Sequence, residues 1–148
     1  MLSYTLYPLL EELSKRFIGT GLKIPSVMAG LIFGIVEFLV YVFCVDKLTI
    51  SFIAVRLSLI LIHMAFSDIT RENLLYGVFV HMAYNFILEV GDIHLAGVMM
   101  SIWITYGLAY SPLILDPYKN ITSKDYFGKM EWYDIAGFVT LVTLFIIL

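Results

Sequence analysis

The segment SVMAGLIFGIVEFLVYVFCV, residues 26–45, decides the fold class of this chain. It has a single charged residue, Glu37, in a run as long as the roughly 20 apolar residues that a helix needs to cross a bilayer. The whole chain has the same character, with 61% hydrophobic and 14% charged residues. A soluble domain is closer to half apolar and about a quarter charged. The sequence therefore predicts an integral membrane protein with an all-α fold.

The same criterion, applied on both sides of this segment, predicts one membrane domain over residues 1–148. It begins with a shorter leading helix at Leu2–Phe17, which paired glutamates interrupt. Joints at residues 46–47, 67–72 and 91–92 and a polar loop at Asp116–Trp132 separate the spans. We expect a polytopic helical bundle of about five spans plus the leading helix. The spans are Ser26–Val45, Thr49–Phe66, Asn73–Val90, Ile93–Leu115 and Tyr133–Leu148.

The basic residues predict the orientation of the bundle. If every segment crosses the membrane, one side receives Lys47 alone. Because the more basic side of a membrane protein faces the cytoplasm, the loops bearing Lys15–Lys23, Arg71 and Lys119–Lys129 are expected there. Both termini then lie outside, provided that the leading helix crosses. The basic residues of the cytoplasmic side are Lys15, Arg16, Lys23, Arg71, Lys119, Lys124 and Lys129.

Ionisable residues inside spans are costly and usually face the bundle interior or a wet cavity. Glu11 and Glu12 point about 100° apart on a helix, so at most one of them can aim squarely into a cavity. Lys15 and Arg16 follow them at a spacing of four residues, in the favoured order for an acid–base pair. Taken alone, this group is typical of a solvated, charge-paired turn at the membrane interface.

Glu37 has no charged residue within eight positions on either side and lies near the middle of its span. An isolated carboxyl at this depth is expected to be neutral, because desolvation penalises the charged form. It is either a neutral group bonded to a neighbouring helix or a proton-handling group in a hydrated pocket. Arg56 does not readily lose its proton, so we expect it to pair with a glutamate.

Two histidines and an asparagine complete the polar set. His63 shares a helical face with Arg56, and His81 shares one with Asn85. Because these residues and the glutamates lie at compatible depths, we expect them to meet in a cavity that opens to the cytoplasm. Such a cluster suits activation of water by a glutamate, with a histidine or an amide holding the oxyanion. It also suits a metal, but no tight ligand spacing such as HExxH is present, so we expect no metal and no other cofactor.

The motif order resembles the CAAX-protease and bacteriocin-processing superfamily of intramembrane glutamic endopeptidases, and its PrsW branch above all. The EExxK and EExxxR signatures are matched by Glu11-Glu12-Leu-Ser-Lys15-Arg16. The PrsW motif Phe-x-x-x-Glu-Asn resembles Phe33-Gly-Ile-Val-Glu37, although Phe38 stands in place of the Asn. The two histidine motifs resemble His63-Met-Ala-Phe66 and His81-Met-Ala-Tyr-Asn85. The matches run in family order over a little over half of the chain.

This resemblance implies a metal-free peptidase that cuts membrane-embedded or membrane-tethered peptides near the cytoplasmic face. Glu11 or Glu12 would activate water, and Glu37 would be the acid of the second motif. His63 and His81 would assist the proton transfers or hold the oxyanion, with Asn85 beside them. The resemblance implies no nucleic-acid partner.

Two other functions remain open. Family members normally have spans before the EExxxR helix, whereas here the motif starts close to residue 1. The superfamily also resembles the non-catalytic scaffold subunit of gamma-secretase, so the chain is alternatively a structural subunit bound to other membrane proteins. A more distant alternative is an ion-binding or transport protein, for which broken helices at a midplane site are typical.

Overall fold

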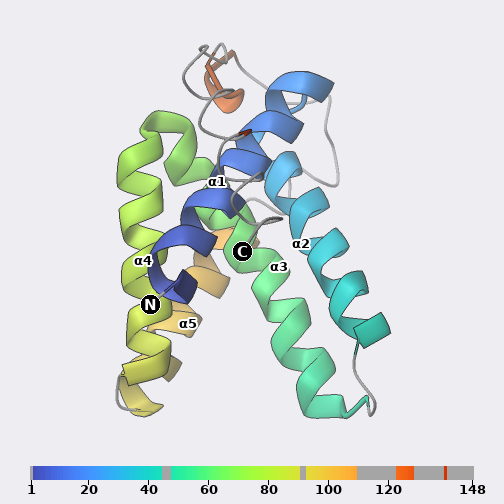
Figure 1. Ribbon diagram of the computed structural model, residues 1–148, viewed down its shortest axis with the longest axis vertical. Helices are drawn as coiled ribbons and strands as arrows, with labels where there is room; N and C mark the ends of the chain where they lie inside the picture. The colour runs from blue at the N-terminus through green and yellow to red at the C-terminus, as the bar shows by residue number, and fades with distance from the viewer. Residues whose placement is uncertain (1, 45–47, 91–92, 110–122, 129–138, 140–148) are drawn as a thin grey trace.

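The computed structural model describes residues 2–44, 48–90, 93–109, 123–128 and 139, and this part of the chain is helical with no strand. The all-α prediction is therefore confirmed for the described residues. Five helices run up and down in chain order, followed by a short 3-10 helix (Figure 1). The elements are α1 (Leu2–Leu22), α2 (Ser26–Cys44), α3 (Ile50–Glu72), α4 (Leu74–Val90), α5 (Ile93–Ala109) and η1 (Ser123–Asp125).

The structure lengthens two of the predicted helices. The leading helix was expected to end at Phe17, but α1 continues to Leu22. It stops where Lys23 adopts a left-handed backbone conformation, with φ 53°, and the Ile24 N–H donates to the Gly19 carbonyl over 3.0 Å. This pattern is a Schellman-type helix end. Gly19 and Gly21 therefore lie in the last turn of the helix.

The predicted joint at Ser67–Glu72 is wrong, because these residues form the last turns of α3. Their polarity suggested a loop, but Ser67, Asp68 and Thr70 are buried inside the bundle. Two of them bond to other helices: Thr70 to Glu12 on α1, and Asp68 to Tyr106 on α5. Polar residues whose bonds are satisfied by other helices do not need a loop.

α3 is the central helix and packs against α1, α2, α4 and α5. The most extensive helix–helix contact joins α2 to α3. A Cβ placed on Gly30 would lie 2.6 Å from the backbone oxygen of His63, and one on Gly34 would lie 2.9 Å from Cα of Ile60. Small residues four apart allow helix backbones to meet in this way inside membranes.

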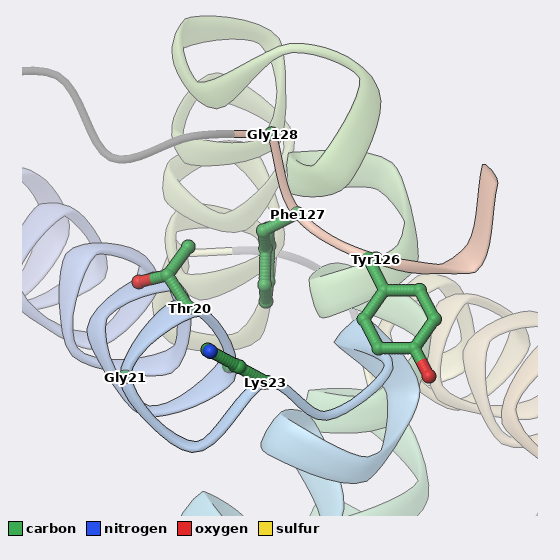
Figure 2. Close-up of a pocket in the computed structure, with 7 residues that line it drawn as sticks. Thr20, Gly21, Lys23, Tyr126, Phe127 and Gly128 are labelled. Carbon is green, nitrogen blue, oxygen red and sulfur yellow. The ribbon is translucent and has the colours of Figure 1, made fainter. Parts of the chain in front are cut away.

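One end of the bundle carries Lys23, Arg71 and Lys124; we call it the basic end, and the opposite end, where α2 ends and α3 begins, the far end (Figure 1). Residues 123–128 dock onto the basic end. Tyr126 bridges to Pro25, the Arg71 guanidinium donates to the Lys124 carbonyl, and Phe127 is buried against Gly19. Figure 2 shows the open cleft of about 550 Å³ between this segment and the end of α1.

Two helices, α2 and α3, are long and apolar enough to cross a membrane. α4 and α5 are apolar but shorter than this criterion requires. The lengths of α2 and α3 support two membrane spans among the described residues. The predicted bundle of about five spans is taken up with the proposed function. The end of the predicted span Ile93–Leu115, the predicted span Tyr133–Leu148 except Val139, and most of the loop Asp116–Trp132 lie outside the described residues.

Candidate functional site

A cleft of about 250 Å³ lies between the first four helices. Its wall includes polar side chains that the sequence singled out: Glu11 from α1, Glu37 from α2, His63 from α3, and His81 and Asn85 from α4. Residues that are 74 positions apart in the chain therefore line one space. The rest of the wall is mostly aromatic or aliphatic.

Glu12 does not line the cleft but lies behind it, fully buried. One carboxylate oxygen accepts from Lys15 Nζ at 2.5 Å and contacts His81 Nδ1 at 2.8 Å. The other accepts from the Thr70 hydroxyl at 2.7 Å. Both oxygens are thus saturated by partners from α1, α3 and α4. Lys15 is also fully buried, and its ammonium lies over the rings of Phe33 and Phe66 at 5.4 and 5.7 Å.

Glu11, unlike Glu12, lies in the wall of the cleft. Its carboxylate lies 3.5 Å from His81 Nε2, so the imidazole stands between two carboxylates. The two ring nitrogens of His81 thus face different carboxylates, Nδ1 the buried Glu12 and Nε2 the cleft-lining Glu11.

Glu37 of α2 contacts two residues of α3, which the spacing of residues within α2 does not predict. Its carboxylate contacts His63 Nε2 at 2.5 Å and lies 3.8 Å from the Arg56 guanidinium, both from α3. The expectation of an isolated neutral carboxyl is therefore wrong, because α3 brings a cation and an imidazole to it. The prediction that Arg56 pairs with a glutamate is confirmed. The guanidinium also stacks on the Tyr41 ring at 3.5 Å.

The pairing of the first glutamates differs from the predicted one. Lys15 bonds to Glu12, three residues before it, and not to Glu11 at the spacing of four. The pair is also dry, with both side chains 0% exposed, so the solvated-turn interpretation is wrong for Glu12 and Lys15. Burial of α1 against α3 and α4 selects this geometry, because Glu12 is the residue that meets Thr70 and His81. Arg16, the third predicted charge-pairing residue, is only partly buried.

Two residues of the site were missed by sequence reasoning. Thr70 was assigned to a joint, and the Tyr84 ring lines the cleft while its hydroxyl is buried without a hydrogen-bond partner among the described residues. Tyr84 lies directly before Asn85 and three residues after His81, which places it on the inner face of the same helix. Helical spacing could therefore have identified Tyr84 as a residue of the site. No spacing within one helix could have identified Thr70, because its partner Glu12 is 58 positions away.

The cleft extends away from the basic end, whereas we expected it to open toward that end. Its lining continues from the polar groups to Tyr41, Arg56 and Leu88, all of which lie nearer the far end. Lys15 and Thr70 close the side toward the basic end and are fully buried. The expectation failed because depth along single helices does not show which side chains pack together above the site.

The site can hold a polar ligand against two carboxylates, two imidazoles and an amide within an apolar wall. No group of three or more His, Cys, Asp or Glu side chains with metal-ligating geometry occurs in the described part of the chain. Comparison with protein-family models, with curated proteins and with solved structures finds no match for this chain.

Proposed function

We propose that this chain is an intramembrane endopeptidase of the PrsW/CAAX-protease type, in which a glutamate-activated water cleaves a peptide bond inside the membrane. The observation that carries the proposal is the shared cleft of Glu11, Glu37, His63, His81 and Asn85. These are the residues that the motifs in family order supply from four helices. The polytopic architecture of about five spans, with the basic end in the cytoplasm, belongs to the same proposal.

Glu11 is the general base in this proposal. It lines the cleft, whereas Glu12 is held by three partners and is not available to a substrate. A water in the cleft gives a proton to Glu11, and its oxygen forms a bond to the carbonyl carbon of the peptide. His81 Nε2 lies 3.5 Å from the Glu11 carboxylate, so the imidazole is placed to assist proton transfer to and from Glu11 without large movement.

The tetrahedral intermediate carries its negative charge on the former carbonyl oxygen. The side-chain amide of Asn85 supplies N–H donors in the cleft wall, and donors aimed at this oxygen lower the barrier. Glu11 then protonates the leaving nitrogen as the C–N bond breaks. The water oxygen and its second hydrogen remain on the new carboxyl group. Atoms and charge balance, and Glu11 ends as it began.

The second pair, Glu37 with His63, positions groups on the opposite wall. The short contact between Glu37 and His63 Nε2 fixes the orientation of the imidazole, as a second carboxylate does for catalytic histidines in general. Arg56 balances the charge of Glu37 from 3.8 Å. Removal of this pair is expected to weaken catalysis by misplacing the ring, while Glu11 and His81 remain in place.

The test is cleavage of a library of membrane-tethered fluorogenic peptides by the purified protein in lipid vesicles. Glu11→Gln should lower cleavage by at least about 100-fold, because a general base contributes roughly 10²–10⁴ to the rate. The matched control is Glu89→Gln, which makes the same change on the exposed side of α4. It should retain the rate of the unmodified protein.

The outcome also separates the peptidase from a non-catalytic subunit of a membrane complex. If the unmodified protein cleaves no peptide, or if Glu11→Gln cleaves as fast as Glu89→Gln, the catalytic assignment is wrong. A subunit uses its polar cluster for packing, so Glu11→Gln should then lower the yield of an assembled complex and not a rate.

A further inference from the structure

The candidate site is closed toward the basic end by a group of buried side chains. Glu12 accepts hydrogen bonds from both Lys15 and Thr70, and all three side chains are 0% exposed. Ser67, which lies three residues before Thr70 on α3, is also fully buried. No cleft-lining residue of α1, α2 or α4 lies nearer the basic end than the polar groups themselves. Within the described residues, the buried ion pair of Glu12 and Lys15 therefore lies between the polar groups of the cleft and the basic end.

Toward the far end the cleft continues. On each of the four helices its lining extends from the polar groups by one or two turns, which is a distance of about 5–11 Å. The residues of this outer part are Tyr7 on α1, Tyr41 on α2, Arg56 on α3 and Leu88 on α4. The lining of α1, α2 and α4 extends only toward the far end, whereas α3 extends two turns toward the far end and also contributes Phe66 on the side of the basic end.

We propose that the cleft is loaded from the far end, and that its ligand is an apolar transmembrane segment of a protein substrate that unwinds over a few residues. This proposal rests on the peptidase function proposed above and adds the side of access and the class of substrate. With the basic end in the cytoplasm, the substrate enters through the outer half of the membrane. The peptide bond is then held near mid-depth and not near the cytoplasmic face, where the family resemblance placed it.

The size and chemistry of the outer cleft fit such a segment. An extended peptide advances about 3.3–3.6 Å per residue, so about three residues fill the distance from the far end to the polar groups. A volume of about 250 Å³ holds a short extended stretch and not a helix with its side chains. The walls beyond the polar groups are aromatic and aliphatic, with a single charged side chain, Arg56.

Arg56 can supply the hydrogen-bond donors that an unwound substrate segment requires. Carbonyl groups released from a helix inside a membrane must find new donors. The guanidinium has five N–H donors and is 23% exposed. Its ion pair with Glu37 is long, at 3.8 Å. Its donors can therefore bind the carbonyls of a segment that passes the outer cleft. We expect it to act as a positioning residue for the substrate backbone.

Cys44 gives a direct test, because it is the single cysteine of the chain, is exposed, and follows Tyr41 by three residues on the same helix. The protein is modified at Cys44 with maleimides of increasing size, and cleavage of a transmembrane fluorogenic peptide is measured. The control carries Cys44→Ser and Gly21→Cys, which places the same adducts at the basic end. A Cβ on Gly21 meets no atom within 4 Å, so this variant is expected to fold normally.

Adducts at residue 44 should lower cleavage progressively with their size, by at least about tenfold for the largest, whereas the same adducts at residue 21 should leave the rate unchanged. The proposal is overturned if the two positions show the opposite order, equal inhibition, or no inhibition at either. The Cys44→Ser protein treated with the same reagents shows that inhibition requires the cysteine.

A second measurement separates this proposal from the peptidase function. Benzophenone maleimide is attached at residue 44 or residue 21 of the Glu11→Gln protein, and an apolar transmembrane peptide is crosslinked by light. Crosslinks at residue 44 alone support access from the far end, even if the unmodified protein cleaves no peptide and the peptidase function fails. Crosslinks at residue 21 alone, at both positions equally, or at neither overturn the access route.

Discussion

Glu11 and Glu12 are adjacent in the chain, but their surroundings differ in a way that predicts different losses on substitution. Glu12→Gln leaves the fully buried Lys15 ammonium without its counter-charge. Removing one partner of a buried ion pair typically costs about 3–5 kcal/mol, so this variant should lose that much stability. Glu11 is partly exposed at the cleft, so Glu11→Gln should change stability far less. Reversible unfolding in mixed micelles measures both.

The double variant Glu12→Gln with Lys15→Met is the control for this prediction. It removes both charges, and the apolar chain of Met lies where Lys15 contacts the Phe33 and Phe66 rings. Replacing a buried pair by apolar groups is often close to neutral, so it should be more stable than Glu12→Gln alone. Equal stability of the single and double variants would mean that Lys15 is solvated.

Tyr84 supports a second prediction at this scale. Its hydroxyl is buried and has no hydrogen-bond partner among the described residues, while its ring packs against Phe66 at 5.4 Å. Tyr84→Phe keeps the ring and removes the polar group, whose burial without a partner costs about 1–3 kcal/mol. The variant should be as stable as the unmodified protein or more stable by about 1 kcal/mol. A clear loss of stability would show that the hydroxyl has a partner.

The sequence predicted which residues meet in the site but not how they pair. Helical spacing placed His63 with Arg56 and His81 with Asn85, and the structure brings both sets to one cleft. The choice of partners depends on contacts between helices, such as that of Glu12 with Thr70, 58 positions away. Such contacts are set by helix rotation and packing, which periodicity within one helix does not contain.

At the scale of elements, the contact of α2 with α3 is extensive and leaves no space for a side chain at Gly30. A Cβ on Gly30 would lie 2.6 Å from the His63 carbonyl oxygen and 2.8 Å from Cα of Met64. Because these neighbours are backbone atoms, Gly30→Ala must push the helices apart, and overpacking of this kind costs about 1–3 kcal/mol. The shift also displaces His63, so peptide cleavage should fall together with the unfolding temperature.

Gly97→Ala is the matched control for that prediction. Gly97 lies in α5 with no atom within 4 Å of an added Cβ. Alanine is a better helix former than glycine by about 0.5–1 kcal/mol, so this variant should be neutral or slightly stabilised. If both glycine variants lose the same stability, the close approach of α2 to α3 is not what requires Gly30.

The helices themselves were largely predictable, because long apolar runs have few alternatives in this composition. The start of α2 at Ser26 agrees with the prediction, and α3 begins directly after Thr49, whose side chain accepts from the Phe52 N–H at 3.1 Å as an N-cap. Helix ends at the basic end were less predictable. There, polar residues such as Asp68 and Thr70 belong to helices because partners on other helices satisfy them.

At the scale of the whole molecule, the charge distribution predicts how the bundle sits in the membrane. Lys23, Arg71 and Lys124 gather at the basic end, while Cys44 lies at the far end of α2. By the positive-inside rule we expect the basic end to face the cytoplasm. In that orientation a membrane-impermeant maleimide added outside intact cells should label Cys44, because this thiol is exposed and would face outward.

The same experiment contains its own comparison. The Cys44→Ser, Gly21→Cys protein should resist the impermeant reagent in intact cells and react only after the membrane is opened, because residue 21 lies at the basic end. Labelling of residue 21 from outside, with protection of Cys44, would invert the bundle. The access route would then lead from the cytoplasm through the far end, since the direction of the cleft within the bundle does not depend on how the bundle is inserted. Orientation and access are therefore separate properties, and the two cysteine positions measure each of them.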